Sequence, residues 1–553
     1  MTVFQLRRFP MNWHSRRDGK EARLKAAGPW IDGKIIKPES ITQVLEAAVK
    51  PQDRVILEGD NQKQATFLAK ALTGVDPDKV KDVTMIIPSV SRDEHLDLFE
   101  KGIAREINFA YAGVQSVRIA DMLANNQVRI GAIHTYLELY ARLFVDLIPD
   151  ICLVAAEKAD EDGNLYTGYS TEDTPIFVEA SAFNKALVIV QVNEIVPRHE
   201  LPRVDIPGDW VDLVVQADQP YQMEALFTRD PRKIRDTHIL MAMMTIKGIY
   251  AKHGVLSLNH GIGYNGAAIE LLLPTYGEEL GLKGKICRHW VLNPHPTMIP
   301  AMESGWVESM FAFGGEKGME RYTEARSDIF PTGPDGTLRS NRAIAQTAGL
   351  YGIDLFLGAT LQMDYLANSS TVTSGRLTGF GGAPNMGHDT RGRRHATPAW
   401  LDMMPERGTS YIGGKKLVVQ MLTSQGRFGP NFVPELDAVK IGREADLPTT
   451  PIMIYGEDVT HVVTEQGIAY LYLARSDEEK TRMLGAVAQG IDIGEKAGPA
   501  VIDSLRKAGK IALPEDLGID PAKADRKLLA AQSLEELVEW SGGLYEIPEK
   551  FRQ

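Results

Sequence analysis

The feature that most constrains the fold of this chain is a repeated order of short apolar run, polar turn and helix-forming segment. Residues 54–57 (RVIL) form the first strand-like run, and the polar turn EGDNQKQA follows it before a helix-forming segment at 66–72. Further strand-like runs lie at 83–87, 107–109, 151–156 and 186–191. Parallel strands covered by helices on both faces need such nearly continuous apolar runs, so the order predicts an open α/β sheet.

The same order begins again after a proline-rich stretch. Residues 197–235 contain Pro197, Pro202, Pro207, Pro220 and Pro231 without helical periodicity, which predicts a linker. Beyond the linker we expect a helix ending near Lys252, a helix from Ala267, and strands at 255–258, 285–292, 355–363, 416–421 and 451–455. VTEQGIAYLYLA is typical of a strand that passes into a helix, and 476–553 is helical and charged.

A chain of 553 residues is too long for one ordinary core. We therefore predict two similar open α/β domains, with a helical C-terminal region. The expected boundaries are an N-terminal arm and helix at 1–50, a first domain at 51–233, and a second domain with the helical extension at 234–553. The helix of the first segment is expected at 41–49, with Ser40 as its N-cap.

Charge and cysteine content exclude several classes of function. The net charge of -12 argues against a nucleic-acid binder, because neutralising phosphates needs a basic surface. No apolar run is long enough to span a membrane, and the arginine-rich N-terminus lacks an apolar signal core. Two cysteines, Cys152 and Cys287, are too few for a disulfide framework or a four-thiolate zinc site. We expect a cytoplasmic protein without a metal, with small molecules and proteins as partners.

Residues 354–395 hold the densest group of backbone-exposing and anion-binding residues in the chain. Several glycines there, among them Gly381 and Gly382, allow backbone N–H groups to crowd a ligand, and a basic tail with Arg394 follows. Such a loop predicts a nest for an oxyanion or thiolate beside a cation for a carboxylate or phosphate. A solvated glycine-rich surface loop is the alternative.

Other motifs carry less information. Gly261, Gly263 and Gly266 form a G-x-G-x-x-G, but the next strand ends in RHW without the carboxylate that a dinucleotide ribose needs. Three histidines, His260, His289 and His295, lie in one region of the sequence. Scattered histidines in proteins are more often core or surface residues than ligands. Neither a phosphate-binding P-loop nor a G-x-S-x-G nucleophile elbow is present.

Several phrases along the chain resemble one family. GDNQKQA, GAIHTYLELYAR, DGNLYTG, STEDTP, LNPHPT and FGGAPNMG are similar to the α subunit of bacterial malonate decarboxylase, within the CoA-transferase superfamily. The resemblance implies two α/β domains facing each other across a thioester site. It also implies the reaction of an acetyl-S-carrier protein with malonate to give the malonyl-S-carrier protein and acetate. The implied partners are the acyl carrier protein, with its CoA-derived phosphopantetheine-type arm, and the decarboxylase subunits. No cofactor is expected to be bound covalently to this chain.

One departure from the superfamily concerns mechanism. Many CoA-transferases use a nucleophilic glutamate in the region that reads KICRHWVLNP here, and this region contains none. Either another carboxylate serves, or malonate attacks the acetyl thioester directly and forms a mixed anhydride. We favour the direct route, because malonate already supplies a carboxylate. Glu465 is interpreted as structural, and Glu303 is the other glutamate considered.

The candidate site residues follow from these patterns and from the resemblance. Gly381, Gly382 and Ala383 are the expected nest for the thiolate, and Asn61 and Gln62 are expected to donate to an acyl oxygen. The expected substrate-binding residues are Gln64, Asn259, His260, Gly261, Gly263, Arg376, Asn385, Gly387 and Arg394, with Arg376 or Arg394 receiving the second carboxylate of malonate. The competing functions are an acetyl-CoA hydrolase or another CoA-transferase on the same fold, and a non-catalytic scaffold that docks the carrier protein.

Overall fold

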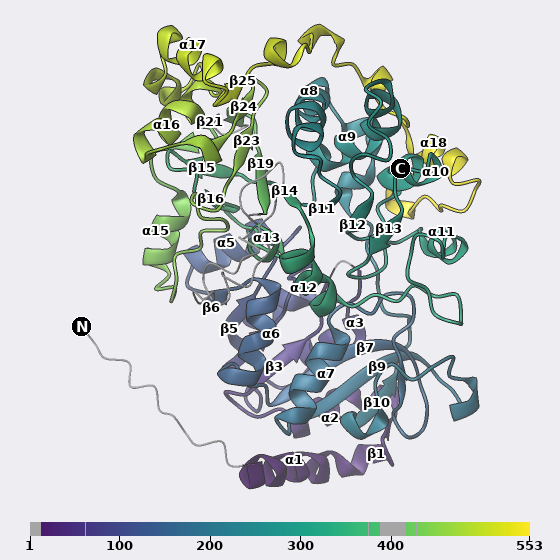
Figure 1. The fold of residues 1–553 in the computed structure, drawn as a ribbon. Helices are drawn as coiled ribbons and strands as arrows, with labels where there is room; N and C mark the ends of the chain where they lie inside the picture. The colour runs from purple at the N-terminus through teal and green to yellow at the C-terminus, as the bar shows by residue number, and fades with distance from the viewer. Residues whose placement is uncertain (1–12, 61, 374, 388–415, 427–428, 553) are drawn as a thin grey trace, which may run out of the picture.

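Two large sheets organise the chain. The structure is a computed structural model that describes residues 13–60, 62–373, 375–387, 416–426 and 429–552. The first sheet uses strands between residues 31 and 216, and the second uses strands between residues 257 and 512. The first sheet lies in the lower part of Figure 1 and the second in the upper part. The predicted α/β class is therefore confirmed.

The first sheet is parallel except at its margins. Its strand order is β1-β2-β10-β9-β7-β3-β4-β5-β6, with β8 paired to β7. Only β1 against β2 and β8 against β7 run antiparallel. The strands are β1 (Ile31–Asp32), β2 (Ile35–Ile36), β3 (Arg54–Leu57), β4 (Val83–Ile86), β5 (Ala104–Phe109), β6 (Arg129–Ile133), β7 (Ile151–Ala159), β8 (Leu165–Tyr166), β9 (Leu187–Ile195) and β10 (Leu213–Gln216).

Both faces of the first sheet are buried. Along β3, Val55 and Leu57 pack into one core while Ile56 packs into another, as alternation along a strand requires. Helices α2 to α5 cover the first core, and helices α6 and α7 cover the second. The helices of this half are α1 (Trp13–Ala27), α2 (Ile41–Ala48), α3 (Thr66–Thr73), α4 (Asp93–Glu100), α5 (Ser116–Ala124), α6 (Tyr136–Val145) and α7 (Thr174–Phe183).

The second sheet has the order β13-β12-β11-β14-β19-β23-β24-β25. It is parallel from β13 to β23, and β24 and β25 extend it antiparallel. Its strands are β11 (Ser257–His260), β12 (His289–Val291), β13 (Ser309–Phe311), β14 (Leu355–Ala359), β19 (Leu417–Met421), β23 (His461–Val463), β24 (Ile468–Ala469) and β25 (Ile511–Ala512).

The second sheet is also covered on both faces. Leu355 and Leu357 of β14 pack with helices α8 and α9, and Phe356 packs with α12 and α16. Helices α12 and α13 lie between the two sheets in Figure 1. The helices of this half are α8 (Asp236–Thr245), α9 (Tyr264–Leu272), α10 (Ile299–Glu303), α11 (Glu320–Ala325), α12 (Arg342–Gly352), α13 (Ala383–Met386), α15 (Asp437–Glu444), α16 (Asp477–Ala486), α17 (Pro499–Lys507) and α18 (Leu534–Trp540).

Several predicted elements of the second half differ from the structure. The predicted strand 355–363 is two elements, β14 and β15 (Gln362–Asp364), because the chain leaves the large sheet and β15 pairs with β16 (Ser369–Ser370) and β22 (Phe432–Val433) instead. The predicted strand-to-helix passage is a hairpin of β23 and β24. Residues 451–455 contribute only an isolated bridge at Ile454. An apolar run shows burial but not the sheet that a strand will join.

Two further predictions were partly wrong. The proline-rich stretch 197–235 is not irregular throughout, because β10 within it adds a strand to the first sheet. The C-terminal stretch is helical in α16, α17 and α18 but also supplies β25. It passes from α17 across the top of the molecule in Figure 1 to α18, which packs on α10. The helix predicted at 41–49 is α2, which starts after Ser40, although the Ser40 side chain makes no capping hydrogen bond. The arm predicted before it is wrong in part, because it forms α1 and supplies β1 and β2 to the first sheet.

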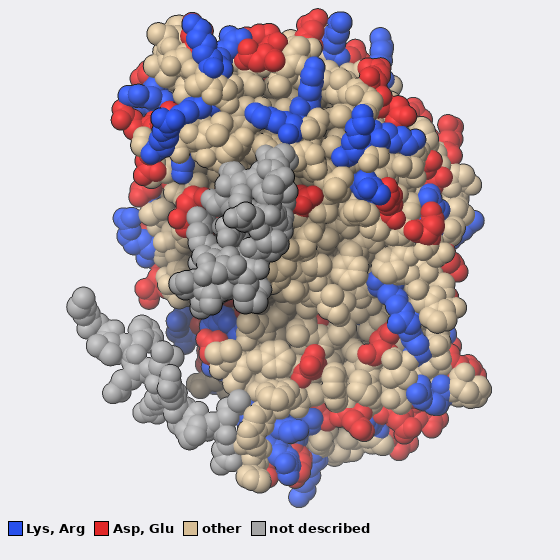
Figure 2. All heavy atoms as spheres, in the orientation of Figure 1, with Lys and Arg blue, Asp and Glu red and all other residues tan. Residues whose placement is uncertain are grey.

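In the described residues, no helix is both long and apolar enough to cross a membrane. Acidic and basic side chains are interspersed on the face drawn in Figure 2, and its coloured residues form no broad basic area.

Candidate active site

The carboxyl ends of both sheets open into one cavity of about 310 Å³. From the first sheet, Asp60 follows β3, Ser89 follows β4 and Tyr111 follows β5. From the second sheet, His260 ends β11 and Asn293 follows β12. Loops at the carboxyl ends of parallel strands are the usual ligand sites of open α/β folds, so this cavity is the candidate active site. A larger and more open groove, bordered by α5, β6 and α15, lacks the buried charged cluster described next.

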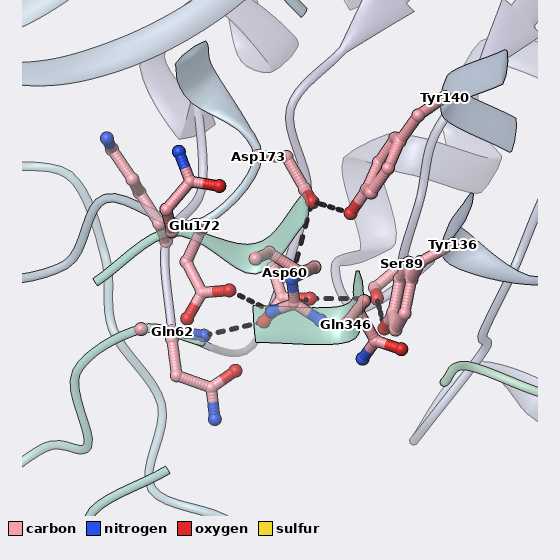
Figure 3. Close-up of polar contacts among 12 residues, drawn as sticks. Asp60, Gln62, Ser89, Tyr136, Tyr140, Glu172, Asp173 and Gln346 are labelled. Carbon is pink, nitrogen blue, oxygen red and sulfur yellow. Dashed lines mark hydrogen bonds and ion pairs between the residues drawn. The ribbon is translucent and has the colours of Figure 1, made fainter. Parts of the chain in front are cut away.

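Arg342, the first residue of α12, joins the two halves of the chain at this cavity. Its guanidinium pairs with Asp60 Oδ2 at 2.9 Å, with Asp173 Oδ1 at 3.3 Å, and with Glu172. The guanidinium also lies 4.5 Å from the centre of the Tyr136 ring. Figure 3 shows the three carboxylates converging on one point. Arg342 is 5% exposed, so these charges are paired away from solvent.

We call the four residues Arg342, Asp60, Glu172 and Asp173 the Arg342 cluster. Neutral hydroxyl groups surround it. Ser89 Oγ donates to Asp60 Oδ2 at 3.0 Å and lies 3.1 Å from Tyr136 Oη. Tyr140 Oη donates to Asp173 (Figure 3). Asp60 also accepts the Gln62 N–H at 3.1 Å, which ties the turn after β3 to the cluster.

Three carboxylates around one guanidinium leave an excess of negative charge. Burial raises the pKa of Glu172 to about 8, although Arg342 opposes the shift. Burial also raises the pKa of Asp173, with Arg342 again opposing it. Glu172 Oε1 and Asp173 Oδ2 are buried without a hydrogen-bond partner. Near neutral pH the cluster therefore retains protons, because desolvation disfavours the ionised carboxylates.

A second buried cluster lies on the other side of the cavity. Glu270 Oε1 is 3.1 Å from His260 Nδ1 and 3.4 Å from His295 Nδ1, and Glu270 Oε2 accepts the hydroxyl of Thr297. His260 Nε2 is 2.8 Å from Tyr250 Oη. His260 and His295 line the cavity, while Glu270 lies behind them. The chemistry of this cluster depends on how the carboxylate orients the two rings.

The described residues contain no group of three or more His, Cys, Asp or Glu side chains arranged to hold a metal ion. The arrangement instead combines an anion-compatible cavity with amide, imidazole and guanidinium groups. Such a site suits the positioning of carboxylate and thioester reactants.

A family model, described as malonate decarboxylase, alpha subunit, transporter, matches residues 12–553. The chain belongs to this family. It is 51% identical over 547 residues to the acetyl-S-ACP:malonate ACP transferase of Malonomonas rubra, covering 98% of each sequence.

Two solved structures of malonate decarboxylase proteins have the same fold. The α subunit from Acinetobacter baumannii is 58% identical with a TM-score of 0.92, covering 98% of this chain and 100% of that one. A chain of a Pseudomonas malonate decarboxylase hetero-tetramer in complex with malonate is 60% identical with a TM-score of 0.93, covering 99% and 100%. The resemblance inferred from the sequence is therefore confirmed.

More distant structures place this family among CoA-transferase-like folds. The putative citrate lyase α subunit from Streptococcus mutans has a TM-score of 0.58 at 15% identity, covering 85% of this chain and 86% of that one. An acyl-CoA transferase from Escherichia coli has a TM-score of 0.51 at 14% identity, covering 80% and 89%. At these identities the comparison concerns the fold alone.

Eight of the residues predicted for the site line the cavity of this family member. They come from the turn after β3, the end of β11 and the glycine-rich segment, and they are Gln62, Asn259, His260, Gly261, Arg376, Gly381, Gly382 and Ala383. Only some of their polar groups lack a partner within the protein and could bind a ligand. Within the described residues, the Gln62 side-chain amide, the Gly382 N–H and the Arg376 guanidinium have no hydrogen-bond or ion-pair partner. Among the eight residues, these three groups are therefore available to a ligand.

Other predicted residues already use their polar groups. Gly381 N–H donates to Ala110 O at 2.9 Å and Ala383 N–H donates to Phe380 O at 3.3 Å, so the expected three-donor nest is reduced to Gly382. Asn259 Nδ2 donates to Val291 O at 2.5 Å. Gly261 N–H donates to Leu357 O at 2.6 Å. Most of these hydrogen bonds join segments that are far apart in the chain, so the sequence pattern could not show that the donors are already occupied.

The remaining predicted residues do not line the cavity or lie outside the described residues. Gln64 is fully buried, with a side-chain amide that has no hydrogen-bond partner. Gly263 and Gly387 do not line the cavity, and Asn385 lies one step behind it, donating to Gln346 Oε1 at 3.1 Å. Asn61 and Arg394 lie outside the described residues.

The sequence analysis did not single out Arg342, Glu172, Asp173 or Glu270 as site residues. One signal could have found Arg342: segment 342–352 (RAIAQTAGLYG) is helix-forming yet holds no acidic residue, so its arginine has no partner one turn away. An unpaired arginine in an apolar helix must find its carboxylate elsewhere in the fold. Glu172 and Asp173 lie in STEDTP, which served only as a mark of family resemblance.

Proposed function

We propose that this chain is the transferase subunit of a malonate decarboxylase and converts acetyl-S-carrier protein and malonate into malonyl-S-carrier protein and acetate. The observation that carries the proposal is full-length identity of 51% to a relative named for this activity. The cavity supports it, because it joins free amide, N–H and guanidinium groups from both sheets at one place. The carrier protein and the decarboxylase subunits are the proposed partners, with the CoA-derived arm of the carrier entering the cavity.

The reaction exchanges one thioester for another and needs little net driving force. A carboxylate oxygen of malonate attacks the acetyl carbonyl carbon, the carbon–sulfur bond breaks, and the thiolate of the carrier leaves. The resulting mixed anhydride holds the acetyl and malonyl groups. The thiolate then attacks the malonyl carbonyl carbon, the carbon–oxygen bond breaks, and acetate leaves. Positioning two bound reactants contributes about 7 to 11 kcal/mol to such a step, so an enzyme nucleophile is not required.

The carboxylates near the cavity favour this direct route. Among the described lining residues Asp60 is the single carboxylate, and Arg342 and Ser89 hold it. Glu303 lies elsewhere, paired with Arg326 and accepting from Tyr322 Oη at 2.6 Å. Glu465 accepts the Ser424 N–H at 2.9 Å and does not line the cavity, which supports its structural interpretation.

Three free groups have proposed roles. The Gly382 N–H is placed to receive the thiolate or the oxyanion, and the Gln62 amide to donate to an acyl oxygen. Arg376 is the proposed partner of a malonate carboxylate, since a guanidinium can bind a carboxylate with two parallel hydrogen bonds. One well-placed oxyanion donor is worth about 3 to 4 kcal/mol in such reactions.

Acyl exchange by the isolated chain tests the proposal. Acetyl-CoA is the donor and isotope-labelled malonate the acceptor, and labelled malonyl-CoA with stoichiometric acetate is the expected product. Acetate release without malonyl-CoA would identify a hydrolase instead. Binding of the carrier protein without any turnover of acetyl-S-carrier protein would identify a scaffold.

Initial rates distinguish the direct route from a covalent one. If malonate attacks directly, both reactants occupy the site together, and reciprocal plots at several fixed malonate concentrations intersect. Hydroxylamine or borohydride should then trap no acyl or CoA thioester on the protein. Parallel lines together with a trapped thioester, for which Asp60 is the first residue to test, would assign covalent catalysis.

A further inference from the structure

His295 faces the cavity from the segment after β12 and is held from behind by Glu270. Its Nδ1 lies 3.4 Å from Glu270 Oε1, and the residue is 4% exposed. It is also a lining residue of the cavity. Within the described residues, no group makes a hydrogen bond with its Nε2. The ring therefore has one nitrogen committed to the protein and one available to a ligand.

The hydrogen bonds around Glu270 determine which nitrogen carries the proton. As an ionised carboxylate, Glu270 accepts from Thr297 and from the Nδ1–H of both His260 and His295. His260 Nε2 then accepts the hydroxyl of Tyr250 at 2.8 Å, so both nitrogens of that ring are occupied. In neutral His295 the free Nε2 is consequently an acceptor, and it becomes a donor only when the ring takes up a proton.

The charges around His295 keep it neutral while the cavity is empty. Burial and the guanidinium of Arg229 lower the pKa of His295, whereas Glu270 and Glu316 oppose the shift. Arg229 is itself paired with Glu316 at 3.5 Å. His260, which shares Glu270 with His295, is a further titratable neighbour of the ring. An anion bound in the cavity would add to the charges that favour the protonated ring.

Malonate supplies such an anion in the proposed reaction. Of the two arginines that line the cavity, Arg342 is already surrounded by three carboxylates, and only Arg376 is free among the described residues. A second carboxylate therefore lacks a cationic partner unless a histidine becomes protonated. His295 is the histidine with a free nitrogen at the cavity, and Glu270 stabilises its imidazolium form from behind.

We propose that His295 takes up a proton from solvent when malonate binds and donates an Nε2–H hydrogen bond to a malonate carboxylate. Glu270 acts as a positioning residue that holds the ring in the required tautomer. The inference rests on the proposed function, because it names a ligand group for malonate in the same cavity. It makes malonate binding dependent on pH, while the chemical steps remain unchanged.

The first test measures proton uptake directly and needs no turnover. Calorimetric titration of the protein with malonate in two buffers of different ionisation enthalpy, at about pH 7.5, reports the protons bound. Both malonate carboxylates are ionised at that pH, so any proton taken up on binding comes from solvent and binds to the protein. We expect a net uptake that approaches one proton per malonate. Binding without proton uptake would overturn the inference, whatever the catalytic activity of the chain.

The second test is the pH profile of the exchange reaction. Between about pH 7 and 8.5, kcat/KM for malonate should fall by up to about tenfold per pH unit, with kcat nearly constant. His295→Gln replaces the ring with a neutral amide donor, so KM for malonate should become nearly independent of pH and proton uptake should disappear. His295→Asn, with a shorter amide, serves as a second variant if His295→Gln does not fold.

His289→Gln is the matched control. His289 lies on β12 of the same sheet, with its Nδ1 2.9 Å from Ser309 Oγ near the surface, and this variant should keep the wild-type profile. Proton uptake that persists in His295→Gln would assign the proton to another group, such as the Arg342 cluster, and would overturn the inference. If the wild-type chain binds malonate with proton uptake but transfers no acyl group, the proposed function fails and the binding role of His295 stands.

Discussion

Arg342 Nη2 lies 2.9 Å from Asp60 Oδ2, and this contact joins the start of α12 to the turn after β3 at the wall of the cavity. The two residues belong to different halves of the chain. Because Asp60 also holds the backbone of Gln62, the ion pair connects the packing of the two halves with the position of a proposed acyl-oxygen donor.

Arg342→Met should destabilise the protein strongly. Removing the guanidinium leaves three buried carboxylates without their cation, a change that costs about 3 to 5 kcal/mol for a buried ion pair. Urea denaturation measures the free energy of unfolding. In a Glu172→Gln background the same substitution should cost less, because the ion pair between Arg342 and Glu172 is already absent. Equal costs in both backgrounds would show that the two residues are not coupled.

The stability of the protein should depend on pH through Glu172. Its pKa is about 8 in the folded chain and 4.5 ordinarily, so between these values the folded state holds a proton that the unfolded state has lost. Stability from this group therefore falls as pH rises from about 4.5 to 8, by at most about 1.4 kcal/mol per pH unit, and changes little above that. Glu172→Gln should flatten the decline in melting temperature between pH 6 and about 8.5, whereas Glu161→Gln on the surface should not. Identical slopes in all three proteins would exclude Glu172 as the source.

Gln62→Ala should lower the rate of acyl exchange by about tenfold or more, the scale expected for one lost transition-state donor. The melting temperature should change little, because the Gln62 side-chain amide has no partner within the described residues. Gln127→Ala, at an exposed glutamine beside the larger open groove, is the control and should retain the wild-type rate. A wild-type rate in Gln62→Ala would remove this amide from the mechanism.

Gly382→Val should abolish exchange for a steric reason. A Cβ at this position would lie 2.3 Å from Gln346 Nε2, displacing a side chain that borders the cavity. Backbone conformation is not the cause, since Gly382 has φ -89°. The neighbouring Gly381 has φ +57°, so Gly381→Ala should instead lower the stability of the protein by about 1 kcal/mol through backbone strain alone. Combining Gly382→Ala with Gln346→Ala should recover part of the activity lost in Gly382→Ala, and no recovery would argue against the steric explanation.

Local sequence was sufficient to predict the α/β class and many strands of the first half. RVIL at 54–57 is β3, and the apolar runs near 83–87 and 151–156 correspond to β4 and β7, because a strand buried on both faces requires an uninterrupted apolar run. Polar and glycine-rich segments after these strands also indicated where the cavity lies. Gln62, His260 and Gly382 are therefore found at its wall.

Only the tertiary structure decided which polar groups of the site are free. The sequence shows that Gly381 and Ala383 carry N–H groups, but not that Ala110 and Phe380 accept them. It shows neither that Arg342 meets Asp60 nor that Glu270 lies behind His295. These contacts join residues far apart in the chain, and their energies depend on burial and geometry that local propensity does not encode. The pattern of apolar runs indicated the fold class, and phrases shared with a known family indicated the family. Long-range packing determined the charges and donors that a ligand meets.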